Sequence, residues 1–140
     1  MNQTTPETAQ QDDPTIGDAD RLLRRIFPGW YVPDQKTSGM RLSSAAFDDQ
    51  SDGSPMSVHL GSVLVDLGLS DDSVLQGHAG YGLAEVSARL VRDNSQVIKR
   101  KPERLWPAHA EVIGRKTDAI RRRLAKAANL LIPPRGPGLV

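Results

Sequence analysis

Proline or glycine ends most of the apolar segments of this chain, and this limits the chain to short helices and strands. The 140 residues include 10 prolines and 12 glycines. "FPG" closes the first apolar segment, Pro33 follows "WYV", Pro102 follows "QVIKR" and Gly114 closes "AHAEVIG". Proline restricts the residue before it, and glycine permits a sharp turn. The expected elements are therefore short, and the length suits a single domain with one hydrophobic core.

Helical spacing of apolar residues predicts three helices. Asp18 can cap the first, whose apolar residues recur up to position 27. Leu83, Val86 and Leu90 recur at i, i+3 and i+7 and indicate a second helix that ends near position 94. Thr117 can cap a third helix that extends to position 131 and has the clearest apolar stripe. A further segment, "SVLVDLGL", fits a buried strand or a short helix, and the "SDDS" after it favours the helix.

Short apolar segments between these helices predict the strands. They cover "WYV", residues 40–47, "MSVHL", "QVIKR" and "AHAEVIG". In "MSVHL", Met56, Val58 and Leu60 would face the core, and Ser57 and His59 would face away from it. This order of elements predicts an α+β fold, in which helices pack on one face of a small, mostly antiparallel sheet.

The ends of the chain differ from this middle part. Residues 1–17 are polar and acidic without an apolar run, so they predict a disordered tail and not a signal peptide. Residues 18–131 would form the domain, and residues 132–140 a flexible tail. No segment approaches the roughly 20 apolar residues of a membrane helix, so we expect a cytoplasmic protein without a membrane partner. The absence of cysteine excludes disulfides, zinc–thiolate sites and cysteine nucleophiles, and no cofactor is indicated.

Charge is unevenly distributed, although the net charge is only +1. Residues 1–20 contain five acidic residues, residues 42–88 contain seven, and neither range contains lysine or arginine. From residue 86 onward there are 13 basic and four acidic residues. The basic C-terminal half could therefore bind a protein partner with an acidic surface, or the two halves could neutralise each other within one fold. The candidate contacts are Lys116, Arg121, Arg122, Arg123 and Lys126.

Nucleic-acid binding is a third interpretation of the same basic residues, because a basic helix can neutralise phosphates. The chain has no pair of helices typical of a helix-turn-helix, no zinc finger and no aromatic stripe that would stack on bases. A run such as "RRR" also occurs on ordinary solvated helix faces, so this interpretation is less favoured than a protein partner.

One candidate site is the predicted strand 40–47. Arg41 and Ser43 would share a face of that strand, where an arginine and a hydroxyl can together bind a phosphate or carboxylate. Ser44 lies beside them as a second hydroxyl. The structural alternative is that Arg41 pairs with the acidic turn "DDQSDG" and the serines bond to nearby backbone.

The histidines provide the second candidate site. None has the spacing of a helical metal pair, so we predict no metal site. His109 lies in "WPAHAEV", where flanking alanines leave room for a general base or for a ligand. They would equally suit a buried histidine bonded to backbone. Ser57 and His59 are candidate ligand contacts, and His78 in "GHAGYG" is discounted.

Two blocks of the chain resemble a set of small, uncharacterised bacterial proteins. The first block reads R-x-S-S-x-x-F followed by S-V, and the second reads P-A-H-A-x-V-x-G before a basic helix. The resemblance spans about residues 21–128 and implies no activity. The matching positions are Arg41, Ser43, Ser44, Phe47, Ser57, Val58, Pro107, Ala108, His109, Ala110, Val112 and Gly114.

A weaker similarity is to the ADP-ribosyltransferase-like folds. These place an early arginine or histidine, a strand serine or tyrosine and a late glutamate around a nicotinamide dinucleotide. Arg24 or Arg25, then Ser43 or Ser44, then Glu111 follow that order. The chain lacks the S-T-S triplet and is short for that fold.

Three functions remain as hypotheses. The first is a non-catalytic accessory protein that docks an acidic partner through the basic C-terminal half. The second is a small enzyme or an anion- or nucleotide-binding protein, in which Arg41 anchors an anion, Ser43 or Ser44 hydrogen-bonds it and His109 moves a proton. It requires Arg41 and His109 to converge. The third is nucleic-acid binding. The sequence does not indicate an oligomeric state.

Overall fold

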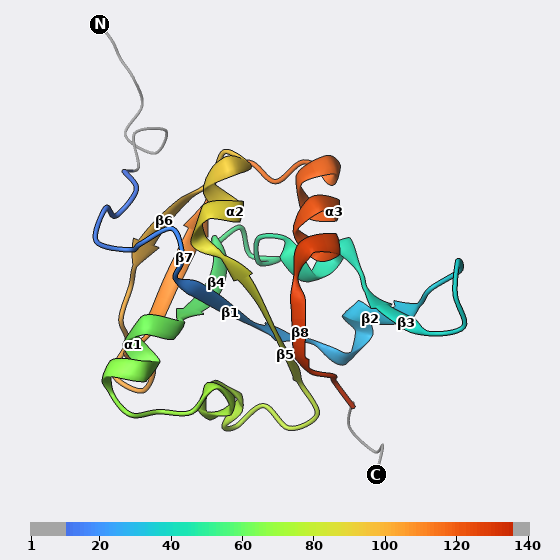
Figure 1. Ribbon diagram of the computed structural model, residues 1–140, viewed down its shortest axis with the longest axis horizontal. Coiled ribbons are helices and arrows are strands. Elements are labelled where there is room, and N and C mark those ends of the chain that lie inside the picture. The colour runs from blue at the N-terminus through green and yellow to red at the C-terminus, as the bar shows by residue number, and fades with distance from the viewer. Residues whose placement is uncertain (1–10, 136–140) are drawn as a thin grey trace, which may run out of the picture.

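A six-stranded antiparallel sheet organises this computed structural model, which describes residues 11–135 (Figure 1). The strand order is β6-β7-β4-β1-β5-β8. Two further strands, β2 and β3, form a separate antiparallel pair. The predicted α+β class and the mostly antiparallel sheet are confirmed. The strands are β1 (Arg21–Ile26), β2 (Tyr31–Pro33), β3 (Met40–Leu42), β4 (Met56–Leu60), β5 (Gly82–Ser87), β6 (Val97–Arg100), β7 (His109–Ile113) and β8 (Asn129–Ile132).

Helices cover the sheet unequally. The helices are α1 (Gly61–Asp66), α2 (Ala88–Asp93) and α3 (Asp118–Ala127), with the 3₁₀ helices η2 (Pro28–Trp30), η3 (Ser44–Phe47) and η4 (Asp71–Leu75). Both α2 and α3 pack on one face of the sheet, above the main core (Figure 1). The short α1 and η4 lie around the opposite face (Figure 1). No helix among residues 11–135 is long and apolar enough to cross a membrane.

The two faces of the sheet therefore carry two apolar clusters. The main core lies beneath α2 and α3, and Met56, Val58 and Leu60 of β4 point into it as predicted. The opposite face holds a smaller cluster, here called the second core. Because β1 and β4 lie in the middle of the sheet, residues on both of their faces are removed from water. The second core consists of Leu23, Leu64, Val74, Leu83 and Ala108.

The predicted helix over residues 18–27 is wrong, because this segment forms β1. Leu22 pairs with Leu60 on one side and with Val86 on the other, so the strand is hydrogen-bonded along both edges. Leu22 and Ile26 enter the main core, whereas Leu23 enters the second core. A strand that is buried on both faces has apolar residues next to each other in sequence, and such a pattern can imitate helical spacing.

The second and third predicted helices each contain a strand as well as a helix. Residues 82–87 are β5, and Ser87 then caps α2 by accepting a hydrogen bond from the Leu90 N–H. Likewise α3 ends at Ala127 and β8 follows it, pairing with β5. Thr117 caps α3 as predicted. In both segments strand pairing in the tertiary structure overrides the local helical pattern.

The predicted strand over residues 40–47 is also shorter than expected. It ends at Leu42, and Ser43 accepts a hydrogen bond from the Ala45 N–H at the start of η3. Arg41 and Ser43 therefore do not share a strand face. The predictions for "WYV", "MSVHL", "SVLVDLGL", "QVIKR" and "AHAEVIG" agree with β2, β4, α1, β6 and β7.

The segment that precedes β1 packs on the sheet. The Asp13 N–H donates to the Ile98 carbonyl of β6 at 2.9 Å, and Ile16 is only 1% exposed. The expected disorder is therefore wrong for residues 11–17, whereas residues 1–10 lie outside the described residues. At the other end, β8 includes Ile132 and the Arg135 N–H donates to the Gly80 carbonyl, so the expected tail does not begin at residue 132. Residues 136–140 lie outside the described residues.

Candidate functional site

The three histidines of the chain gather around Trp106. The ring of His59 has its centroid 5.7 Å from that of Trp106 and 5.8 Å from that of His109, and the His78 ring lies 6.0 Å from Trp106. His59 and His109 are register partners on β4 and β7. Trp106 belongs to the connection between β6 and β7, and His78 to the glycine-rich loop before β5. Sheet pairing thus brings together aromatic rings that are distant in the sequence.

His59 is buried, and its ring has no hydrogen-bond partner among residues 11–135. It faces away from the main core, as predicted, but the second core covers that side and leaves the residue only 2% exposed. Neither Nδ1 nor Nε2 has a hydrogen-bond partner among the described residues. Burial, followed by the positive charge of Arg25, lowers the pKa of His59 to about 3. His59 is therefore a neutral imidazole near pH 7, with one donor and one acceptor nitrogen.

A cavity of about 170 Å³ lies against His59. Trp106 lines it beside His59, together with Leu64 and Val74 of the second core. Leu69 and Leu105 also line the cavity and are 42% and 77% exposed, so they lie on its solvent side. The cavity therefore has mostly apolar walls, with His59, Ser73 and Gln76 as its polar lining residues and exposed leucines at its outer edge.

Arg25 is a half-buried cation next to Trp106. Its guanidinium carbon lies 4.4 Å from the centroid of the Trp106 ring, a cation–π distance. Its Nε donates to the Val74 carbonyl at 2.6 Å, whereas Nη2 is buried without a partner among the described residues. Burial lowers the pKa of Arg25. The surroundings of His59 thus favour a hydrogen-bond acceptor more than another cation.

His109 differs from His59 because both of its ring nitrogens have partners. Nδ1 lies 2.8 Å from the Lys101 carbonyl, and Nε2 lies 3.0 Å from Ser57 Oγ. The Gln50 Nε2 group also donates to Ser57 Oγ, at 3.2 Å. Ser57 and His109 were both predicted as candidate site residues, and the structure brings them into direct contact.

Arg41, Ser43 and Ser44 do not join this group. Arg41 lies on β3, where its Nη1 donates to the Leu42 carbonyl. Figure 1 shows β3 and β7 toward opposite ends of the molecule, so Arg41 and His109 do not converge. Ser43 caps η3, and Ser44 is the first residue of η3. The pocket expected between Arg41, Ser43 and His109 is therefore not formed.

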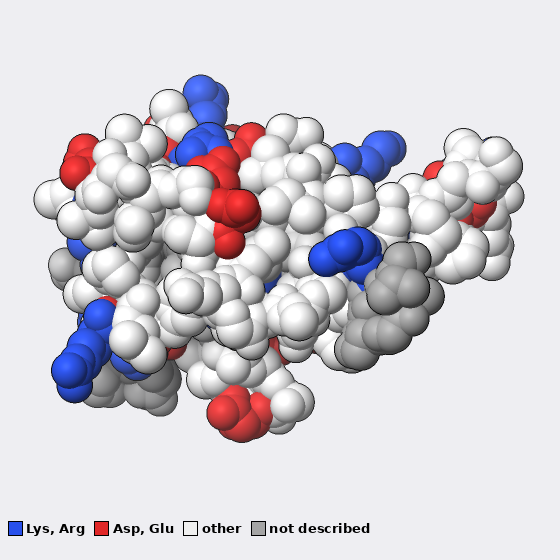
Figure 2. Space-filling view, turned by 90° about the horizontal axis from the view of Figure 1, so that it is seen from below, with Lys and Arg blue, Asp and Glu red and all other residues white. Residues whose placement is uncertain are grey.

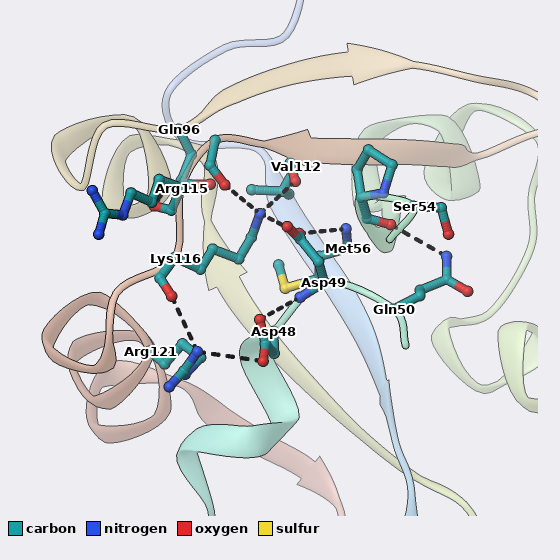
Figure 3. Close-up of polar contacts among 12 residues, drawn as sticks. Asp48, Asp49, Gln50, Ser54, Met56, Gln96, Val112, Arg115, Lys116 and Arg121 are labelled. Atoms are coloured by element: carbon teal, nitrogen blue, oxygen red, sulfur yellow. Dashed lines mark hydrogen bonds and ion pairs between the residues drawn. The ribbon is translucent and has the colours of Figure 1, made fainter. Parts of the chain in front are cut away.

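The acidic turn that follows η3 binds the basic residues before and within α3 (Figure 3). The Lys116 side chain is only 1% exposed, and its Nζ donates to Asp49 Oδ1 at 2.6 Å and to the Val112 and Gly114 carbonyls at 2.9 and 3.1 Å. Asp49 also accepts from the Met56 N–H. Asp49 thus joins the start of β4, through the Met56 N–H, to Lys116 at the junction between β7 and α3.

The remaining candidate contacts of the basic half divide into two groups. Arg121 donates to Asp48 at 3.3 Å and also pairs with Asp118, and Arg123 donates to Asn94 Oδ1 at 3.1 Å. Arg122 and Lys126 are exposed and form no ion pair within residues 11–135. Internal ion pairs therefore account for two of the five predicted partner contacts, Lys116 and Arg121. Arg123 is held by a hydrogen bond to a neutral amide, which leaves its charge uncompensated.

Comparison of the chain with protein-family models, curated proteins and solved structures finds no match. The resemblance to small bacterial proteins stays a prediction. Of the residues in the ADP-ribosyltransferase-like order, Arg24 is buried and donates to the Ala46 and Ser57 carbonyls, and Glu111 pairs with Lys101 at 3.6 Å. This places them in structural contacts and not around a common cavity.

Sequence reasoning assigns no role to Trp106 and names Arg25 only as an alternative to Arg24 in the ADP-ribosyltransferase-like order. Arg25 follows another arginine in "LLRRI", and neither the sequence order nor the spacing distinguishes the two. The sequence contains one indication of Trp106, which is its position in the tryptophan–proline pair before the alanine-flanked His109. A tryptophan in a polar connection between strands has a large apolar surface to bury, and here it does so against the histidines.

Proposed function

We propose that this protein binds a small, largely apolar molecule that carries one oxygen-containing polar group, with that group at His59. The observation that supports the proposal is a neutral imidazole, 2% exposed and without a partner among the described residues, beside a cavity of about 170 Å³. A buried polar group that is left unpaired costs about 1–3 kcal/mol. A ligand oxygen that bonds to His59 would recover part of that cost.

The size and the walls of the cavity restrict the ligand. An apolar cavity of about 150 Å³ is large enough to bind benzene. A molecule with one ring or a short branched chain therefore fits, whereas a nucleotide does not. The face that carries α1 and η4 is mostly uncharged, with basic and acidic residues in small separate groups (Figure 2). A hydroxyl can accept from the protonated ring nitrogen of His59 or donate to the unprotonated one, and a carboxylate would also be attracted to Arg25.

The cavity can be tested with cyclohexanol, which does not absorb where tryptophan fluoresces. The variant Trp30→Phe leaves Trp106, in the cavity wall, as the sole tryptophan. Titration with cyclohexanol should change its fluorescence to saturation, and cyclohexanecarboxylate tests the contribution of Arg25. Cyclohexane, which lacks the oxygen, should bind more weakly. Equal affinity for cyclohexane and cyclohexanol would contradict a polar role of His59.

A cavity-filling variant provides the matched control. Ala108 lines the cavity and is buried, so Ala108→Leu should occupy the space and abolish the fluorescence change. Ala119 is exposed on α3, and Ala119→Leu should bind like the parent protein. Thermal melting verifies that both variants are folded. Undiminished binding by a folded Ala108→Leu variant would place the ligand elsewhere and refute the proposal.

Docking of an acidic partner and nucleic-acid binding are less well supported. Both require accessible basic side chains before or on α3, and three of the five candidates have partners within the protein. Arg122, Arg123 and Lys126 are exposed, and these two proposals depend on them.

A further inference from the structure

Ser57 and His109 form a hydrogen-bonded pair whose proton arrangement can be deduced. The Lys101 carbonyl is an acceptor only, so His109 Nδ1, 2.8 Å away, must carry the proton. In the neutral ring, Nε2 then has the lone pair and accepts the Ser57 hydroxyl proton across 3.0 Å. The Gln50 amide donates to Ser57 Oγ, which leaves the hydroxyl proton free to point at Nε2.

The pair is held by regular structure and by one connection. Ser57 is the second residue of β4, and His109 begins the adjacent strand β7, where it pairs with His59. The Lys101 N–H donates to the His109 carbonyl at 2.9 Å, so both the ring and the backbone of His109 are hydrogen-bonded to Lys101. The Glu103 carboxylate lies 3.9 Å from Nδ1. His109 is 8% exposed, whereas Ser57 is half-buried and within reach of a small molecule.

This arrangement is specific to Ser57 among the serines that make side-chain hydrogen bonds in residues 11–135. Ser54 and Ser62 donate to aspartates, at 2.6 Å in each case. Ser43 accepts from backbone. A serine beside an oriented neutral imidazole has a base that can remove its proton, and this is the condition under which a serine becomes nucleophilic.

We infer that Ser57 is the nucleophile of an acyl-transfer site and that His109 is its general base. Ser57 Oγ attacks the carbonyl carbon of an activated ester while its proton passes to His109 Nε2. Collapse of the tetrahedral intermediate breaks the bond to the leaving oxygen, which takes the proton from Nε2 and departs as an alcohol. Water then attacks the acyl-serine in the same way, and the products are a carboxylic acid and the free hydroxyl.

The Lys101 carbonyl acts as the orienting group in this scheme. It holds the Nδ1–H and stabilises the imidazolium that forms when Nε2 accepts the proton, which is the task of the third group in serine–histidine sites. The inference is independent of ligand binding at His59, because Ser57 does not line that cavity.

The experiment uses 4-nitrophenyl acetate with the full chain. Release of the nitrophenol is followed by absorbance, and peptide mass mapping locates the acetyl group. Ser57 should be acetylated faster than Ser54 and Ser62, which serve as internal comparators. Equal acetylation of the three serines would overturn the inference.

Two variants separate chemistry from folding. His109→Asn places an amide N–H where Nδ1–H stands and removes the base, so acetylation of Ser57 should slow about 100-fold or more. Ser57→Ala should remove the acetyl group from that peptide and leave lysine acetylation unchanged. Thermal melting shows whether each variant folds, and added imidazole should partly restore the rate of a folded His109→Asn variant. An unchanged rate in folded His109→Asn would overturn the role of His109. Cyclohexanol binding is measured on the same variants, so failure of either proposal is recognised separately.

Discussion

His59 and His109 lie opposite each other on β4 and β7 with ring centroids 5.8 Å apart, yet only His109 has hydrogen-bond partners among the described residues. The difference follows from their surroundings. The carbonyl of Lys101 and the hydroxyl of Ser57 are both at His109, whereas His59 meets the second core, Trp106 and the cavity. Adjacent strands thus present one histidine suited to proton transfer and one suited to ligand contact.

The first prediction concerns the pH dependence of stability. The pKa of His59 is lowered from its ordinary value of 6.5 to about 3 in the folded protein, chiefly by burial. Between these values the unfolded chain binds a proton that the native protein does not, so the free energy of unfolding falls as the pH falls. The loss from this group should be about 2 kcal/mol between pH 6 and pH 4.

Urea denaturation at several pH values measures this dependence. The control is His59→Phe, which has similar shape and no titrating nitrogen, so its stability should fall less over the same range. It should also be as stable as the parent protein at pH 7, because replacing an unpaired buried polar group by an apolar one is close to neutral or favourable. Parallel pH profiles for the two proteins would show that His59 is not shielded from protons.

The second prediction concerns Lys116 and Asp49. Asp49→Ala removes the carboxylate that lies 2.6 Å from a lysine whose side chain is 1% exposed. Loss of one partner of a buried pair leaves an uncompensated charge, and Asp49 is itself 37% exposed, so the expected cost is about 2 kcal/mol. Urea denaturation at pH 7 measures it. Asp52→Ala in the same turn should cost less than Asp49→Ala.

The double variant Lys116→Met with Asp49→Ala tests the cause of that loss. It should recover part of the stability lost in Asp49→Ala, because the buried charge is gone as well as its partner. If the two substitutions instead destabilise additively, the pair does not interact as the contact distance implies.

Much of the fold follows from the sequence, and the errors have a common cause. The alternation of Met56, Val58 and Leu60 correctly predicts the inner face of β4, because one side of that pattern is apolar throughout. Helical spacing wrongly predicts helices over the segments that form β1 and β5, because both faces of these strands are buried. Partners that are distant in the chain decide this, and local spacing does not contain them.

The sequence predicts the candidate site only in part, because contacts between distant segments also decide which of its residues meet. Residue types and predicted strands indicate His109, Ser57 and His59 as candidates, and sheet register places them together. The grouping of Arg41 with Ser43 assumes that a strand extends through Ser43, but the backbone leaves the strand at Leu42. Sequence order cannot show which serine meets the imidazole.

The third prediction separates the two kinds of arginine on α3. Arg121→Glu loses the contacts with Asp48 and Asp118 and places like charges together, so it should lower the melting temperature. Arg122→Glu changes an exposed side chain without an ion pair in residues 11–135 and should change stability by less than about 0.5 kcal/mol. Thermal melting compares them. If Arg122→Glu also abolishes recovery of an acidic partner in a pull-down, the docking proposal gains support, and unchanged recovery contradicts it.

The fourth prediction concerns the segment before β1, which was expected to be disordered from the sequence. Ile16 is buried in the main core, and Arg92 of α2 donates to the Ile16 carbonyl at 2.7 Å and pairs with Asp18 at 2.8 Å. Ile16→Ala should therefore lower the free energy of unfolding by about 2–4 kcal/mol, since truncation of a buried isoleucine loses apolar contacts and leaves a cavity. Urea denaturation measures the change. Val65→Ala truncates a side chain that is 69% exposed and is the control, with an expected effect below about 0.5 kcal/mol. An equally small effect of Ile16→Ala would mean that the segment does not pack on the sheet in solution.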